Sequence, residues 1–246
     1  MHFNSEQLLD NDVLERGFIL DDIPGILWTG ASSGPLEPRP LLLLGHPGGL
    51  ATNHHRLLSR ARTAIESGFA AATIELPGNG HRPSIPALDQ ARVELRQALE
   101  AHQAPTDDVI DRLVLPLVEQ AVPEWRAAIT ALQALPEIDE RIGYAGGVIS
   151  IGIRLALIEP RIVAAGLFAG SYIPMSTFND ARQLRIPVHV LLQWDDHDND
   201  RNAALDLFDA LGSREKTLQA NMGGHTGVPS YAGEDAARFF TRHLKV

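Results

Sequence analysis

The chain has 246 residues, a formal net charge of -10 and no cysteine. This length suits one large α/β domain or two small ones, with one domain as the default. A content of 44% hydrophobic and 21% charged residues is typical of an ordinary globular protein rather than a disordered or membrane-embedded one. Without cysteine, disulfides, thiolate nucleophiles and thiolate metal sites are excluded. The acidic balance argues against nucleic acid and anionic membrane surfaces as partners.

The N-terminal segment, MHFNSEQLLDNDVLERG, is polar and acidic. A secretory signal would instead have basic residues followed by an apolar stretch. The longest apolar runs, such as 41–44, are too short to span a bilayer. We therefore expect a cytoplasmic protein without a membrane span, and the oligomeric state stays open.

The predicted elements begin with strands at 18–20, 23–28 and 40–45. The last of these contains the run LLLL between proline and glycine, which is typical of a strand covered on both faces. Beyond it, strands alternate with helices: helices are predicted at 54–67, 122–135, 203–211 and 234–244, and strands at 69–74, 141–145, 163–168, 188–193 and 217–219. The alternation predicts one domain over residues 1–246, a doubly wound, mainly parallel sheet with helices on both faces and functional loops at the carboxyl ends of its strands.

Residues 84–121 interrupt this alternation. Helical patterning covers 87–101 and starts again at Asp107, with breaks expected at Pro105 and Pro116. A long insertion at the functional edge favours a helical lid or cap over a merely extended surface helix. Its apolar residues suggest a small-molecule substrate with an apolar portion; they are Leu95, Leu99, Val109, Leu113, Val114 and Leu117.

Motifs with reactive side chains follow several predicted strands. They are GHPGG at 45–49, ELPGNGHRP at 75–83, GYAGGVISIGIR at 143–154, QWDDHDND at 193–200 and NMGGHTG at 221–227. Together they resemble the α/β-hydrolases, nearer to the dienelactone-hydrolase-like branch of small esterases, over residues 18–244. The order serine, acid, histidine is the order of that fold. The resemblance implies a cofactor-independent carboxylic ester hydrolase whose lid follows the fourth strand of the sheet.

A serine nucleophile needs a base within hydrogen-bond reach, and the base needs an acid that orients it. His225 follows two glycines in a loop that can present an imidazole, so it is the candidate base. Asp195, Asp196 and Asp198 compete as the acid, and the resemblance selects Asp196. The other two carboxylates are then expected to be solvated loop charges.

Two backbone N–H groups are needed to stabilise an oxyanion. The resemblance implies one from the residue after the nucleophile, which is Ile151 if the nucleophile is Ser150. The second comes from the loop HPGG, where Pro47 has no N–H and Gly48 is the expected donor.

The position of the nucleophile is open. A window centred on Ser150 has Gly152 after it but Val148 where a small residue is expected, and a β-branched side chain fits poorly in so tight a turn. A window shifted by two residues has small residues at both flanks, Gly146 and Ser150, but places Val148 at the nucleophile position. In a third interpretation Ser150 only caps the helix that follows.

Three functions are therefore compatible with the sequence. The first is a serine hydrolase that cleaves an ester, thioester or lactone through an acyl-enzyme, with Ser150, His225 and Asp196 as its triad. The second is a lyase, isomerase or cyclase that uses acid and base chemistry alone, with Val148 at the turn. The third is a ligand-binding protein on the same fold. No histidine spacing indicates a metal site.

Overall fold

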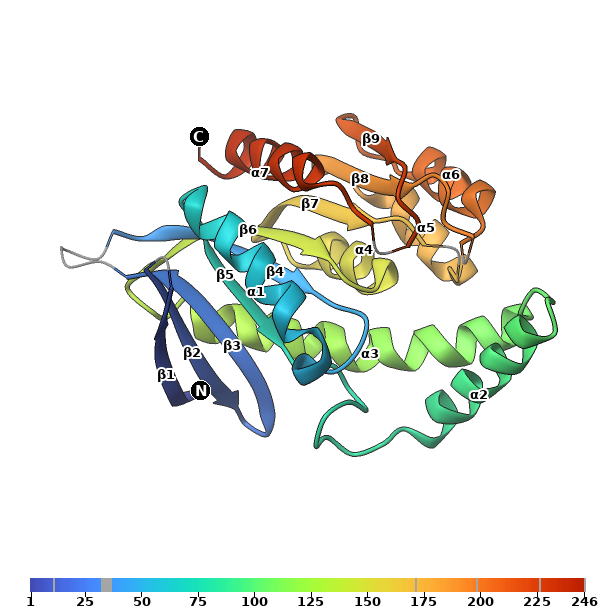
Figure 1. The fold of residues 1–246 in the computed structure, drawn as a ribbon, viewed down its shortest axis with the longest axis horizontal. Coiled ribbons are helices and arrows are strands. Elements are labelled where there is room, and N and C mark those ends of the chain that lie inside the picture. The colour runs from blue at the N-terminus through green and yellow to red at the C-terminus, as the bar shows by residue number, and fades with distance from the viewer. Residues whose placement is uncertain (11, 32–36, 171, 198, 226, 246) are drawn as a thin grey trace.

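The computed structural model describes residues 1–10, 12–31, 37–170, 172–197, 199–225 and 227–245. In this part of the chain, nine strands form one sheet in the order β1-β2-β3-β5-β4-β6-β7-β8-β9 (Figure 1). The strands are β1 His2–Leu9, β2 Val13–Leu20, β3 Ile23–Gly30, β4 Arg39–Gly45, β5 Ala70–Ile74, β6 Ile138–Gly146, β7 Ile162–Phe168, β8 Val188–Gln193 and β9 Lys216–Asn221. The helices are α1 Leu50–Glu66, α2 Pro86–Glu100, α3 Asp107–Leu132, α4 Ile149–Ile158, α5 Met175–Gln183, α6 Arg201–Ala210 and α7 Ser230–Leu244.

The sheet is parallel from β5 to β9, and β1, β2 and β3 form an antiparallel meander at one end. The predicted mainly parallel, doubly wound sheet is thereby confirmed. The sequence did not indicate β1, because its side chains are polar and mostly exposed, so no apolar alternation marks it as a strand. Pairing with β2 supplies its backbone hydrogen bonds instead.

The LLLL run shows how the two faces of the sheet are filled. Leu41 and Leu43 belong to one core cluster, and Leu42 and Leu44 belong to another. Successive side chains of a strand point to opposite faces, so each leucine pair fills one side of β4. Helices α1 and α7 cover one side, and α3 to α6 cover the other (Figure 1).

Helix α3 differs from its prediction. It continues from Asp107 to Leu132 through Pro116 and Pro123, whereas the sequence predicted a break at Pro116 and a separate helix at 122–135. An internal proline costs about 3 kcal/mol. Burial of apolar residues along the helix offsets this cost, and Pro123 itself is exposed.

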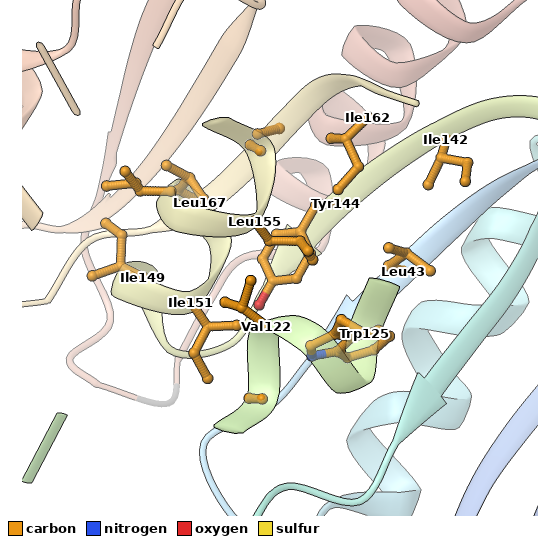
Figure 2. Close-up of a cluster of buried hydrophobic side chains, with 14 of the residues drawn as sticks. Leu43, Val122, Trp125, Ile142, Tyr144, Ile149, Ile151, Leu155, Ile162 and Leu167 are labelled. Atoms are coloured by element: carbon orange, nitrogen blue, oxygen red, sulfur yellow. The ribbon is translucent and has the colours of Figure 1, made fainter. Parts of the chain in front are cut away.

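The second half of α3 belongs to the core. Figure 2 shows Trp125 of α3 beside Tyr144 of β6, with Val122 on the same helix. The rings of Trp125 and Tyr144 meet edge to face with centroids 6.2 Å apart. The expected insertion at 84–121 therefore has no boundary at residue 121, because its second helix is also a core helix.

No helix in the described ranges is long and apolar enough to cross a membrane. The parallel strands β4 to β9 end at one edge of the sheet. The loops that carry the reactive residues leave this edge.

Candidate active site

A histidine and a buried aspartate are joined at the carboxyl edge of the sheet. Nδ1 of His225 lies 2.8 Å from Oδ2 of Asp196. The Asp196 side chain is 2% exposed, whereas that of His225 is 56% exposed. Asn199 also donates to Asp196 Oδ2. If Nδ1 carries the proton that bonds Asp196, Nε2 is left as an unprotonated base that faces outward.

The histidine lies beside the strands that hold the centre of the sheet. Its ring contacts Phe168, the last residue of β7, at a centroid distance of 6.3 Å. Strand β7 pairs with β6, which leads into the glycine turn. The predicted acid and base therefore come together at the end of the strand next to the one that leads into the glycine turn.

Asp195 orders the histidine loop, which is a correction to its prediction as a solvated charge. Its Oδ1 accepts hydrogen bonds from the backbone N–H groups of Gly223 (2.8 Å) and Gly224 (2.9 Å). These bonds hold the pKa of Asp195 below its usual value, with Gly224 as the larger cause. Gln193 donates to the carbonyl of Gly224 from the other side (2.9 Å). Asp198 lies outside the described residues.

Asp195→Ala is expected to loosen this loop without unfolding the chain. Protection of the Gly223 and Gly224 amides against hydrogen exchange should fall by about tenfold, because each loses a charged acceptor. In the native sequence the pKa of Asp195 is below its unfolded value of about 3.9. The contribution of Asp195 to the stability of the folded state is then fully present above its unfolded pKa and is lost as the pH falls through its folded pKa.

Nuclear magnetic resonance measures these protection factors residue by residue. Asp209→Ala, which removes an exposed carboxylate from α6, serves as the control. Equal protection in Asp195→Ala and Asp209→Ala would contradict the role given to Asp195.

The turn between β6 and α4 is made by two glycines. Gly146 and Gly147 have φ of +73° and +74°, a backbone conformation that favours glycine. Val148 is the N-cap residue of α4, and no side chain caps this helix. The structure thus has Val148 at the tip of the turn, as in the shifted window.

Ser150 lies inside α4 rather than at the turn, which corrects the window centred on it. It is 2% exposed, and its Oγ accepts a hydrogen bond from Thr177 Oγ1 of α5 (2.9 Å). In the described part of the chain, no hydroxyl group is hydrogen-bonded to His225. Ser150 is not the helix cap either, because that position belongs to Val148.

Ile151 does not have the free N–H that was predicted for it. Its amide donates to the carbonyl of Val148 (3.0 Å) within the first turn of α4, and its side chain lies in the core cluster of Figure 2. Ile149 is the first residue of α4, and the N–H of a first helical residue has no acceptor within its own helix. Gly48 lies half-buried in the turn between β4 and α1.

Glu75 holds the start of α1 beside this turn. Its Oε1 accepts a hydrogen bond from the N–H of Leu50, the first residue of the helix (3.0 Å). A carboxylate at this end of a helix is stabilised by the helix dipole. Glu75 therefore connects the loop after β5 with the start of α1.

The α2–α3 hairpin is fastened at its base. Arg82, in the loop after β5, donates to both carboxylate oxygens of Glu124 on α3 and to the carbonyl of Glu75. Much of the apolar face expected to line a pocket is used for packing: Val109, Val114 and Leu117 are buried, whereas Leu99 is 45% exposed.

Solved structures match the whole chain, although no protein-family model and no curated protein matches it significantly. A cold-adapted esterase from an Arctic intertidal metagenomic library has a TM-score of 0.75 and 26% identity, with 99% of this chain and 100% of that chain covered. An acetyl xylan esterase from Paenibacillus sp. R4 has a TM-score of 0.66 and 16% identity, with coverages of 99% and 88%.

A third structure, from Klebsiella pneumoniae subsp. pneumoniae MGH 78578, is described as a dienelactone hydrolase. It has a TM-score of 0.66 and 14% identity, covering 96% of this chain and 99% of its own. The chain has the α/β-hydrolase fold. The resemblance drawn from the sequence is thereby confirmed. The named esterases among the similar structures are consistent with a carboxylic ester hydrolase-like enzyme.

Proposed function

We propose that the protein hydrolyses small carboxylic esters or lactones, with His225 acting as general base on water. The observation that carries the proposal is the hydrogen-bonded pair of His225 and Asp196, which leaves one ring nitrogen exposed at the edge of the sheet. The position of Ser150, buried and bonded to Thr177, favours water over Ser150 as the attacking group. The neighbouring structures of esterases support ester hydrolysis as the reaction class.

In the proposed reaction, Nε2 of His225 takes a proton from water as the water oxygen bonds to the carbonyl carbon. Asp196 stabilises the imidazolium that forms and holds its orientation. The tetrahedral intermediate then expels the alcohol oxygen, which takes the proton from Nε2. The products are an acid and an alcohol, or a hydroxy acid from a lactone, and His225 returns to its starting state.

The negative charge on the carbonyl oxygen needs donors that are already in place. We assign this role to the backbone N–H groups of Gly48 and Ile149, which we call the oxyanion site. Ile149 replaces Ile151 in this role because the Ile151 amide is used within the helix. The N-terminus of α4 adds a favourable partial positive charge.

Exposed apolar side chains near the dyad support a substrate with an apolar portion. Trp194 directly precedes the acid loop and is 41% exposed, and Met222, before the histidine loop, is 63% exposed. The two segments are joined because the Trp194 N–H donates to the carbonyl of Asn221 (2.7 Å). In the described part of the chain, an open depression of about 470 Å³ beside Asp196 has Trp194 as its one apolar lining residue among polar and charged side chains.

The test compares wild type with a variant that removes both buried hydroxyls, Ser150→Ala with Thr177→Val. Removing both partners avoids leaving one hydroxyl unpaired in the core. We expect the double variant to hydrolyse p-nitrophenyl esters of short acyl chains within about threefold of the wild-type rate, whereas loss of a true nucleophile costs at least about 10³-fold.

Intact-protein mass after treatment with a fluorophosphonate gives an independent readout. The proposal expects no adduct on Ser150. An adduct that maps to Ser150, together with loss of activity in the double variant, would restore the acyl-enzyme mechanism. If folded wild type hydrolyses neither these p-nitrophenyl esters nor simple lactones, the proposed function is overturned.

A further inference from the structure

Arg60 of α1 reaches the carboxyl ends of two neighbouring strands. Its Nη1 donates to the carbonyl of Gly45 (2.7 Å) and its Nη2 to the carbonyl of Ala145 (2.5 Å). Gly45 ends β4 and Ala145 is the next-to-last residue of β6, and these strands pair in parallel. One guanidinium group therefore joins the strand that leads to Gly48 with the strand that leads to Ile149.

The charge on Arg60 has no carboxylate partner among the described residues, and its guanidinium group donates to two carbonyl oxygens. Burial lowers its pKa to about 10, against a smaller opposing effect of Tyr144. The side chain of Arg60 is partly buried, and a cation drawn out of water without a counterion costs free energy, so an apolar side chain would serve packing alone better. A cation kept there points to a role at the strand ends that it joins.

The strand ends and the guanidinium group fit closely. A methyl group added at Gly146 would lie 2.7 Å from Nη2 of Arg60, and one added at Gly147 would lie 2.7 Å from Cα of Gly45. Contacts this short leave no room for an extra atom. The end of β4, the glycine turn and the guanidinium group therefore set one another's positions.

We propose that Arg60 is a positioning residue that holds the two halves of the oxyanion site at their working separation. The inference rests on the proposed function. Gly48 lies three residues after Gly45, and Ile149 lies four residues after Ala145, so both donors extend from carbonyls that Arg60 fixes. Its positive charge also favours the negative charge that develops on the substrate oxygen.

The test uses Arg60→Met, which keeps the length of the side chain but removes its donors and its charge. Arg56→Met is the matched control, because Arg56 lies on the same helix one turn earlier and is exposed. We expect Arg60→Met to lower kcat by about 10- to 100-fold with KM within about threefold. The two N–H donors would no longer be aligned with the oxyanion in the transition state, whereas binding of the substrate in the ground state would be kept. Arg56→Met should leave both constants unchanged.

Arg60→Lys keeps the charge and can reach one carbonyl at a time, so we expect a smaller loss of kcat than in Arg60→Met. If Arg60→Met does not fold, Arg60→Lys tests the positioning role of Arg60 in its place, with Arg56→Lys as its control. Hydrogen exchange by mass spectrometry should increase in segments 45–50 and 145–151 of the Arg60 variants and not in the controls.

The outcomes separate the two claims. An active wild type with unchanged kcat in the folded Arg60 variants would overturn the role of Arg60 and leave the proposed function standing. A rise of KM without a fall of kcat would do the same. An inactive wild type would overturn the proposed function and this inference with it.

Discussion

His225→Ala is expected to lower ester hydrolysis by about 10³-fold, within the range found for the loss of a general base. The imidazole is the group that takes the proton from water. Asn199 also donates to Asp196, but its amide has no basic nitrogen that could replace the imidazole. Steady-state kinetics with a p-nitrophenyl ester measure the effect, and the loss should appear in kcat with little change of KM.

Two further variants make this result specific. Asp196→Asn should lose about 10²-fold or more, because an amide in this position cannot stabilise the imidazolium and favours the wrong tautomer. His197→Ala removes an exposed histidine next to Asp196 and should retain full activity. Equal rates for His225→Ala and His197→Ala would mean that the dyad does not carry the reaction.

Trp125→Ala is expected to lower the free energy of unfolding by about 3–5 kcal/mol, the usual cost of deleting a large aromatic side chain from a core. Trp125 is 0% exposed and contacts Tyr144 of β6, which directly precedes the glycine turn (Figure 2). Chemical denaturation followed by circular dichroism measures the change.

Trp125→Phe separates shape from hydrogen bonding. The Nε1 atom of Trp125 is buried without a partner in the part of the chain that the structure describes, so phenylalanine loses volume but no hydrogen bond. We expect a smaller cost, below about 3 kcal/mol. A cost of Trp125→Ala below about 1 kcal/mol would contradict the central place given to this residue in the core.

The fold was predictable because its signals are local and repeated. The LLLL run, the glycine and proline boundaries, and the alternation of strands with amphipathic helices each depend on a few neighbouring residues. The polar strand β1 lacks such a signal, and so does the continuity of α3, because the cost of its prolines is offset by residues that are distant in the sequence.

The pairing of His225 with Asp196 was also anticipated, because both follow strands that end at the same edge of a parallel sheet and the resemblance to the α/β-hydrolases selected Asp196 among three aspartates. The function of Asp195 was not, because three neighbouring aspartates look alike until the glycine loop folds against one of them. Arg60 has no signal in the sequence at all: it is one of several arginines in the chain, and its hydrogen bonds reach strand ends 15 and 85 residues away.

By itself, the sequence determined the α/β architecture and the edge at which the reactive loops gather, because the hydrophobic period of each element is a local pattern. The choice of Asp196 as the acid beside His225 rested on the resemblance of the motifs to those of the α/β-hydrolases. Only the tertiary structure decided which residue stands at the turn. The windows on Val148 and Ser150 differ by two residues, which preserves the alternation of a strand, so the strand pattern does not choose between them. The decision comes from the close contact of Gly147 with Gly45 and from the burial of Ser150 against Thr177, both of which exist only after distant segments have packed.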